Sequence, residues 1–269
     1  MTDSTLELSS TIRTAADRLS AAAADGVPCH PVRDLIGSTD ITLAYAVQQQ
    51  VNQDRVAAGA QVVGRKIGLT SKAVQDQLGV DRPDLGVLFA DMRYDASAPI
   101  PVTRLLQPKV EAEIAFVLGS DLVDGNLDRE QVAAAVDHAV AAVEICDSRI
   151  AGWDITFGDT VADNASAGGF VLGSERRTLD RFSPVDAEMT MTVTGQEPSA
   201  GTGAACLGDP LLALQWLART ARDLGDPLRA GQIVLSGALG PMRRAAPGAR
   251  VDVTITGLGS LSLTFAEES

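Results

Sequence analysis

The chain has 269 residues, of which 45% are hydrophobic and 21% are charged, as is typical of globular proteins. At roughly 150 residues per domain, this length predicts one large domain or two modest ones, with core enough to fold without a disulfide or a structural metal. The 22 basic and 35 acidic side chains give a net charge of −13, which excludes nucleic acid and anionic membranes as expected partners because both require a basic surface.

The cysteines and the start of the chain indicate a reducing compartment. Cys29, Cys146 and Cys206 are odd in number and form no CxxC pair, which excludes a disulfide framework and a zinc site of that type. The N-terminal stretch is polar and lacks the apolar segment of a signal peptide, and no apolar run approaches the roughly 18 residues of a membrane span. We therefore expect a cytoplasmic protein without membrane contact.

The first part of the chain is predicted to be mostly helical. Apolar residues recur at helical spacing in two segments; Gly26 and Pro28 end the first, and Asp40 caps the second. A shift in composition near Asp95 suggests a boundary between an N-terminal helical and mixed region, 1–95, and a strand-rich region, 96–269. The predicted elements are helices over 6–24, 41–58 and 71–78, a strand over 62–69 and a loop over 79–86.

The second part combines strands with a few helices. A helix is predicted over 128–143, capped by Asp128 and with valines recurring along one face, and another begins at Asp209 and Pro210 and runs to 224. The predicted strands are 110–118, 170–172, 187–193, 233–236, 251–255 and 261–265, with a hairpin turn at 257–259. Strand runs with interspersed helices indicate the α+β class rather than a regular βαβ alternation.

Two acids in the predicted strand 110–118 are the sharpest local feature. A strand has a period of two, so Glu111 and Glu113 share one face, while the opposite face is apolar. Two like charges about 7 Å apart beside an apolar surface are costly without a cation, and a hard divalent ion with oxygen ligands removes that cost. The alternative is an exposed strand edge with two solvated acids, which is the commoner situation for acidic side chains.

Two further residues extend this candidate site. Glu144 ends the predicted valine-rich helix among apolar neighbours, so it could complete a three-carboxylate site or could be a solvated acid at a helix end. Lys66 lies between Gly64 and Gly68, which permit a ligand or another backbone to approach closely. A lysine near a metal-bound enol can move protons or hold a carboxylate, whereas the alternative is a lysine that extends along the surface.

Two polar or glycine-rich segments are weaker candidates. Residues 153–169 are polar for the middle of a fold, and Asp159, Asp163, Asn164 and Ser166 could line a cleft or simply stabilise turns. The glycines of 236–242 could present backbone N–H groups to an anion, or the segment could be a plain exit from a strand. His138 fits the polar face of the predicted helix 128–143 and is expected to be structural.

Taken together, four segments resemble the 2-keto-4-pentenoate hydratases, or 2-hydroxypenta-2,4-dienoate hydratases, of the fumarylacetoacetate hydrolase superfamily. They are VVGRKIGLTSKAVQDQLGVDRPDLGVLFADM, LQPKVEAEIAFVL, VEICDSRIAGWDITFGDTVADNASAGGFVLG and LSGALGPM. Weaker similarity elsewhere extends the resemblance over nearly the whole chain, and several long motifs in the same order are a specific signal. The resemblance implies a mixed β-roll core in the 96–269 region, with a smaller helical N-terminal region.

The resemblance also implies a ligand set and an activity. Carried over by motif, Glu111, Glu113 and Glu144 would hold Mg²⁺ or Mn²⁺, and Lys66, Asp84 and Ser166 would be catalytic. Lys66, Ser166 and Leu78 would contact the substrate. The family is oligomeric, commonly a ring of dimers, and a complex with a decarboxylase or a downstream aldolase is a further expectation.

The implied reaction is the metal-dependent hydration of 2-hydroxypenta-2,4-dienoate to 4-hydroxy-2-oxopentanoate in the catabolism of aromatic or related rings. The sister family, 4-oxalocrotonate (2-oxo-3-hexenedioate) decarboxylase, is the alternative, with Arg149 or Lys109 as the cation for a second carboxylate. A role as the partner subunit of a decarboxylase–hydratase complex also stays open. Fumarylacetoacetase-type hydrolysis fits less well, because neither His30 nor His138 has a matching context.

Overall fold

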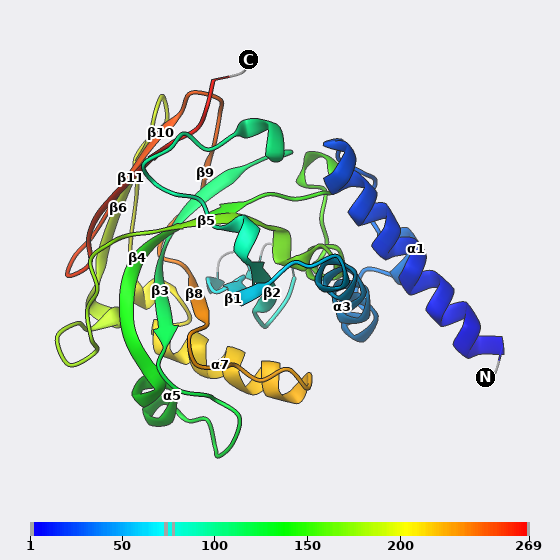
Figure 1. The fold of residues 1–269 in the computed structure, drawn as a ribbon, viewed down its shortest axis with the longest axis horizontal. Coiled ribbons are helices and arrows are strands. Elements are labelled where there is room, and N and C mark those ends of the chain that lie inside the picture. The colour runs from blue at the N-terminus through cyan, green and yellow to red at the C-terminus, as the bar shows by residue number, and fades with distance from the viewer. Residues whose placement is uncertain (1–2, 73–74, 77–78, 268–269) are drawn as a thin grey trace.

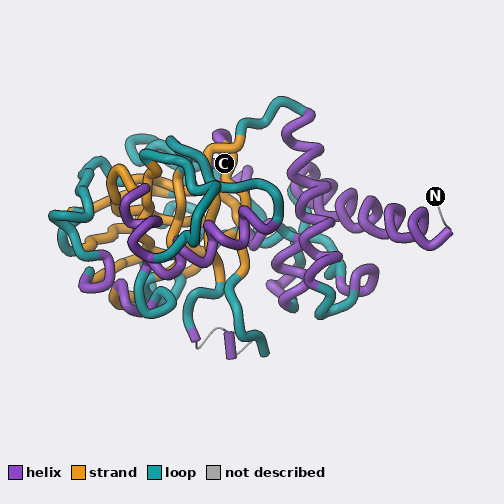
Figure 2. The backbone as a smooth tube through the Cα atoms, turned by 90° about the horizontal axis from the view of Figure 1, so that it is seen from below, coloured by secondary structure: helices purple, strands orange, loops and turns teal. Residues whose placement is uncertain are grey.

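The computed structural model describes residues 3–72, 75–76 and 79–267, with a helical N-terminal end beside a larger part in which sheets and further helices pack together (Figures 1 and 2). The N-terminal end is helical and has its own core, in which α1 and α3 pack together and against α6. Apolar residues at helical spacing form this core, which includes Ala15, Leu19, Ala44 and Val47. The helices at this end are α1 (Asp3–Asp25), α2 (Arg33–Ile36), α3 (Ile41–Ala57) and α6 (Phe157–Ala162).

A seven-stranded mixed sheet forms the centre of the molecule. Its strands follow the order β2-β1-β8-β3-β4-β5, with the short β9 beside β3. Neighbouring strands of this sheet pair antiparallel, except β1 and β8, which run parallel. The strands are β1 (Val62–Gly68), β2 (Asp84–Phe89), β3 (Lys109–Leu118), β4 (Val136–Cys146), β5 (Ala167–Leu172), β8 (Ile233–Ala238) and β9 (Arg243–Arg244).

A second sheet and two helices cover one face of the central sheet. The second sheet has the order β11-β10-β6-β7, and helix α7 packs against β8 and α5 below the sheets in Figure 1. The apolar face of β3, which carries Ile114 and Phe116, lies in the main core that forms here. The elements are β6 (Glu188–Val193), β7 (Ser199–Thr202), β10 (Arg250–Ile255), β11 (Gly259–Thr264), α5 (Arg129–Ala135) and α7 (Pro210–Asp223).

Short 3-10 turns connect several of these elements, and they are η1 (Ala90–Met92), η2 (Val102–Arg104), η3 (Ala151–Trp153), η4 (Asn164–Ser166), η5 (Pro184–Asp186) and η6 (Gly203–Ala205). The α+β class, the curled sheet and the helical N-terminal region agree with the expectation from the sequence. Among the residues described, no helix is long and apolar enough to cross a membrane. The boundary near Asp95 stays a prediction.

The helix predicted over 128–143 is wrong in its second half. Helix α5 ends at Ala135, and Val136–Cys146 form strand β4, one of the longest strands of the central sheet. The valines and alanines of this segment fit a strand buried on both faces as well as they fit one side of a helix. Because β3 and β5 pair with it on either side, its β-branched side chains favour the strand. Glu144 and His138 therefore lie on a strand and not on a helix.

Two smaller differences concern the segment before the site. The loop predicted over 79–86 ends early, because β2 begins at Asp84 and pairs antiparallel with β1. Half of the helix predicted over 71–78 falls on positions 73–74 and 77–78, outside the described residues, and the described positions 72, 75 and 76 are helical. The predicted substrate contact Leu78 is among those positions.

Candidate metal and substrate site

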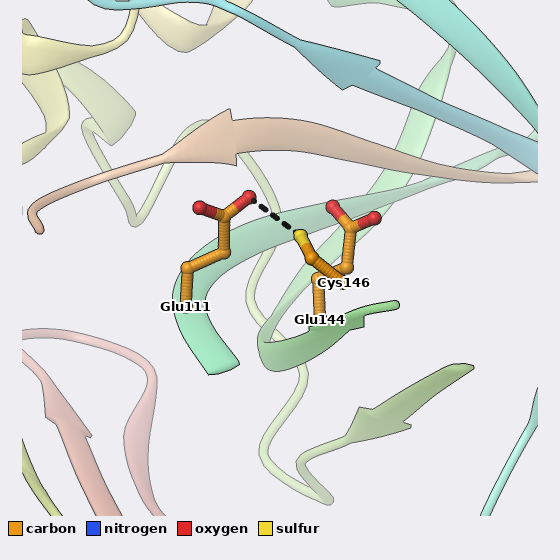
Figure 3. Close-up of side chains that lie close together, drawn as sticks. All are labelled: Glu111, Glu144 and Cys146. Carbon is orange, nitrogen blue, oxygen red and sulfur yellow. Dashed lines mark hydrogen bonds between the residues drawn. The ribbon is translucent and has the colours of Figure 1, made fainter. Parts of the chain in front are cut away.

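Three glutamates meet on one face of the central sheet, at the junction of β3 and β4. Glu111 and Glu144 are direct partners in the antiparallel register, and Glu113 pairs with Ala142 two positions further along. The period of two places Glu111 and Glu113 on the face opposite the main core, as the sequence predicted. The same period on β4 puts Glu144 and Cys146 on that face, where their side chains point to the same side as Glu111 (Figure 3).

All three glutamates are buried, which rules out the alternative of a solvated strand edge. Their exposed fractions are 6% for Glu111 and 0% for Glu113 and Glu144. The thiol of Cys146 donates to Glu111 Oε1 at 3.5 Å, and the Gly237 N–H donates to Glu113 Oε2 at 2.7 Å. The glycine-rich segment after Ile233 thus presents an N–H group to an anion, and that anion is a carboxylate of the chain itself.

The electrostatics of the cluster favour a bound cation. Burial raises the pKa of Glu113 well above its usual value, and the charges of Glu144 and Glu111 raise it further. Burial likewise raises the pKa of Glu144 to about 7, although Lys66 opposes the shift. Glu113 Oε1 and Glu144 Oε2 are buried without a hydrogen-bond partner. Buried carboxylate oxygens without donors are costly, and a divalent cation satisfies them, so this donor set fits a hard metal ion.

Cys146 adds a sulfur atom to the edge of this oxygen cluster. One ligand atom each of Glu111, Glu144 and Cys146 lie within 4.8 Å of one another. Burial and the charge of Glu111 raise the pKa of the Cys146 thiol well above its usual value, which keeps it protonated as the donor to Glu111. Mg²⁺ and Mn²⁺ prefer oxygen ligands, so Glu113 fits as the third ligand better than Cys146.

Lys66 faces the glutamates from strand β1. Its ammonium lies 3.1 Å from Glu144 Oε1 and donates to the Ala165 carbonyl oxygen at 2.9 Å. Burial alone would lower the pKa of Lys66, but the charges of Glu144, Cys146, Asp84 and Glu111 raise it well above its usual value. Lys66 is only 3% exposed, so the alternative of a lysine extended along the surface is wrong.

The glycines around Lys66 make room for this arrangement. A Cβ at Gly68 would lie 2.2 Å from Asp84 Oδ1 and 3.2 Å from Lys66 Nζ. A Cβ at Gly86, the register partner of Lys66 on β2, would lie 2.4 Å from the Asn164 carbonyl oxygen. These positions require glycine because a side chain would displace the groups beside Lys66.

Asp84 and Ser166 meet through a residue that the sequence did not single out. Thr160, on α6, lies with its hydroxyl 3.4 Å from both Asp84 Oδ2 and Ser166 Oγ, and all three residues are buried. Asp84 Oδ1 has no hydrogen-bond partner, and burial raises the pKa of this carboxyl against the opposing charge of Lys66. The only signal for Thr160 was its place in the polar segment 153–169, where threonine has many structural roles.

The other polar residues of 153–169 have structural contacts. Asp159 accepts hydrogen bonds from the backbone of Val32 and Arg33, so it ties α6 to the N-terminal helices. Asp163 is buried and accepts from Ser148 Oγ and from the Arg149 side chain and backbone N–H. Neither side chain reaches the glutamates, whereas Asn164 bonds to strand β2.

A cavity beside the N-terminal helices does not coincide with the glutamate cluster. It has a volume of about 540 Å³ and lies between α1, α3 and the segment 162–168. Its lining includes Arg55, Arg149 and Asn164 but none of the three glutamates or Lys66. The buried carboxylate oxygens without a hydrogen-bond partner, on Asp84, Glu113 and Glu144, lie outside its lining.

Comparison with known proteins agrees with this geometry. The family model described as fumarylacetoacetate (FAA) hydrolase C-terminal matches residues 46–266. The chain belongs to this family. It is 53% identical over 256 residues to the TodF product hydratase of Pseudomonas putida F1, which covers 95% of this chain and 96% of the relative. It is 51% identical over 256 residues to a 2-keto-4-pentenoate hydratase of Burkholderia vietnamiensis G4, covering 95% and 98%.

Solved structures of the family carry the same fold with a metal. The 4-oxalocrotonate decarboxylase of Pseudomonas putida G7, in complex with magnesium and adipate, superposes with a TM-score of 0.90 at 30% identity and covers 94% of this chain and 97% of that chain. The fumarylpyruvate hydrolase of Pseudomonas aeruginosa, at 17% identity and a TM-score of 0.56 over 76% and 89% of the two chains, supports the fold alone. The resemblance that the motifs indicated is confirmed, and a divalent metal is in keeping with the family.

Proposed function

We propose that this chain catalyses the metal-dependent hydration of 2-hydroxypenta-2,4-dienoate to 4-hydroxy-2-oxopentanoate, in the catabolism of aromatic or related rings. The observation that carries the proposal is the buried cluster of Glu111, Glu113, Glu144 and Lys66 in a chain that is 49–53% identical to seven hydratases. A hydro-lyase of this type needs a cation for the substrate's carboxylate and 2-oxygen, and groups that move protons between carbons.

The three glutamates would hold the ion, and Mg²⁺ or Mn²⁺ suits three carboxylates equally well. When bound, the cation supplies electrostatic stabilisation of negative charge that develops on the substrate oxygens. The partnerless oxygens of Glu113 and Glu144 are the atoms available to it. Cys146 and Gly237 hold the remaining oxygens of Glu111 and Glu113 in place.

The proton movements define what the side chains must do. The 2-hydroxyl loses its proton and C5 gains one, which gives the 2-oxo-3-enoate; water then adds its oxygen to C4 and a proton to C3. Lys66, whose pKa is raised, stays an ammonium and stabilises negative charge through Nζ. Asp84 has a raised pKa and a free Oδ1, which suits a group that donates and accepts a proton. Ser166 and Thr160 would orient the water.

The contacts of Arg149 and Lys109 disfavour the alternative decarboxylase. That reaction needs a free cation for a second carboxylate. Arg149 bonds to Asp163 and to the Asp147 and Ala167 carbonyl oxygens, and the Lys109 ammonium lies 3.9 Å from the centre of the Trp153 ring. Both cations are therefore engaged within the protein.

The assembly and location of the chain are part of the proposal. A homo-oligomer, a complex with a decarboxylase or an aldolase, and a cytoplasmic location are each in keeping with relatives that act on small molecules. Size measurement by light scattering tests the oligomer, and co-purification with the decarboxylase tests the complex.

The deciding experiment uses freshly prepared 2-hydroxypenta-2,4-dienoate and follows the loss of its absorbance with Mg²⁺ or Mn²⁺ and with EDTA. A parallel sample contains 2-oxo-3-hexenedioate and is monitored for CO₂. Metal-dependent loss of the dienoate without CO₂ supports the hydratase. Release of CO₂ with a stable dienoate identifies a decarboxylase, and turnover by the purified chain alone excludes a purely partner role.

A further inference from the structure

A turn of left-handed backbone lies directly beside Lys66. Asn164, Ala165 and Ser166 have φ values of 54°, 51° and 52°, and all three residues are buried. Residues other than glycine rarely adopt this conformation, and consecutive ones are rarer still, because each costs steric strain. Strain of this kind persists only where surrounding contacts determine it.

The Asn164 side chain supplies such contacts from a strand edge. Its Oδ1 accepts from the Val87 N–H at 2.8 Å, and its Nδ2 donates to the Val87 carbonyl oxygen at 2.9 Å. Val87 lies on β2, the edge strand of the central sheet, so one amide side chain pairs with the strand as a neighbouring backbone would. The absence of a side chain at Gly86 lets the turn approach this closely.

The turn presents two groups to the site and is anchored at its far end. The Ala165 carbonyl accepts the hydrogen bond from Lys66 Nζ, and Ser166 Oγ lies 3.4 Å from Thr160 Oγ1. The Ser166 carbonyl accepts from the Asp147 N–H at 2.7 Å. Any shift of this turn therefore moves the partner of Lys66 and the hydroxyl of Ser166 together, while the glutamates stay on β3 and β4.

We propose that Asn164 is a positioning residue, which clamps the left-handed turn to β2 and so fixes the ammonium of Lys66, which stabilises negative charge, and the hydroxyl of Ser166, which orients the water. This inference rests on the proposed hydratase activity and deepens it. Asn164 need not touch the substrate, because its effect passes through the Ala165 carbonyl and the Ser166 hydroxyl. The metal ligands are held by other strands, so the clamp should control the chemical step and leave metal binding unchanged.

The test separates the side chain of Asn164 from its backbone conformation. Asn164→Gly removes both bonds to Val87 but accepts a positive φ without strain. Asn164→Asp keeps the acceptor for the Val87 N–H and loses the donor to its carbonyl, and it serves if the glycine variant folds poorly. Gln131→Ala is the matched control: the Gln131 side-chain amide also bonds to backbone with both its groups, accepting from the Leu127 N–H at 2.9 Å and donating to the Asp124 carbonyl oxygen at 2.6 Å, but it lies on α5 and neither partner belongs to the candidate site.

We expect Asn164→Gly to lower kcat by about 10²-fold, the size of loss that a misplacement of about 1 Å produces. Asn164→Asp should lower kcat less, and Gln131→Ala should keep kcat. The Kd for Mn²⁺, from calorimetry of the apoprotein, should stay within about twofold in all three variants, since a separate strand pair holds the ion. A kcat of Asn164→Gly equal to that of the wild type, or an equal fall of kcat in Gln131→Ala, would overturn the clamp.

An activity-independent measurement distinguishes this inference from the proposed function. Hydrogen exchange at the Val87 and Asp147 amides should accelerate in Asn164→Gly, while in Asn164→Asp the Val87 amide stays protected. Unchanged exchange at both amides in the glycine variant overturns the clamp even if the enzyme is active. If the wild type does not turn over the dienoate, the hydratase proposal fails, and the exchange result still decides whether Asn164 holds the turn.

Discussion

The glutamates of β3 and β4 lie on regular antiparallel strands, whereas Lys66, Asp84 and Ser166 depend on a glycine-bearing strand edge and a left-handed turn. On the regular side, register alone sets the carboxylates opposite one another. On the irregular side, side-chain clamps and missing Cβ atoms set the positions of the reactive groups. The groups that would hold a metal are thus separated, by the way the backbone supports them, from the groups that would move protons.

This difference implies that the two sides can fail independently. A change among the glutamates of β3 and β4, the strand side, should alter metal affinity first. A change around Lys66, Asp84 and Ser166, the edge side, should alter the rate of the chemical step at normal metal affinity. The two sides meet at the ion pair of Lys66 with Glu144. The following variants test whether the division holds.

Glu113→Gln should have the largest effect, because it removes a negative charge from the ligand set while it keeps the volume. We expect at least a 10³-fold loss of kcat/KM, since a metal centre supplies several kcal/mol at about 1.36 kcal/mol per tenfold. Calorimetry with Mn²⁺ should show a matching loss of affinity. Near-normal Mn²⁺ affinity in this variant would remove Glu113 from the proposed ligand set.

Lys66→Met should be nearly as severe but of a different kind. It keeps most of the stem volume and removes the ammonium, so we expect kcat to fall by about 10²–10³-fold, the range for loss of one group that stabilises developing negative charge. The Mn²⁺ affinity should be retained or increase, because a positive charge beside Glu144 disappears. Full kcat/KM in Lys66→Met would remove Lys66 from the mechanism.

Asp84→Asn should lower activity and raise stability. Burial raises the pKa of Asp84 in the folded protein, so ionisation costs the folded state stability. That cost is absent at pH values below the unfolded pKa of about 3.9, grows as the pH rises from the unfolded to the folded pKa, and is complete above the folded pKa. The Tm of the variant should therefore equal that of the wild type near pH 3.5. At pH 7 it should be higher by a few degrees, which corresponds to about 1 kcal/mol of stability. Calorimetry in EDTA measures both Tm values. A variant that melts below the wild type at pH 7 would contradict the idea that ionised Asp84 destabilises the fold.

Cys146→Ala should have the smallest effect, confined to the strand side. Loss of the thiol donor to Glu111 should weaken Mn²⁺ binding by about tenfold, the lower end for residues that support metal ligands. Cys146→Ser, which keeps a donor, should recover part of the affinity. The matched control is Cys206→Ser, because Cys206 is buried but donates to the Ser236 carbonyl. An equal loss of Mn²⁺ affinity in the Cys206 variant would mean that the effect comes from disturbed packing and not from the lost donor to Glu111.

The sequence predicts the strand side of the site well because one rule governs it. The alternation along 110–118 placed Glu111 and Glu113 on one face, and that face is the one without the main core. Glu144 was placed with the right residues but on the wrong element, since a valine- and alanine-rich run fits a buried strand and a helix alike. Its exact pairing with Glu111 needed the register, which is a long-range property.

The edge side could be predicted only as a set of residues. The family motifs indicated Lys66, Asp84 and Ser166, but nothing local to 160–166 predicts a left-handed turn without glycine. Asn164 tolerates that conformation better than most residues, yet its partner Val87 is 77 positions away. Thr160 was missed for the same reason, because its role depends on contacts between segments that the chain brings together only when folded.

The direct pairing of Glu111 with Glu144 has a consequence for how the chain survives in the cell. Like charges placed opposite each other weaken an antiparallel pair, so the centre of the largest sheet contains its own source of repulsion. A cation bound there adds its binding free energy to the stability of the fold and ties β3 to β4. With the proposed ion bound there, the lifetime of the folded protein would depend on the supply of divalent ions, and a cell short of them would lose this protein by degradation as well as by inactivity.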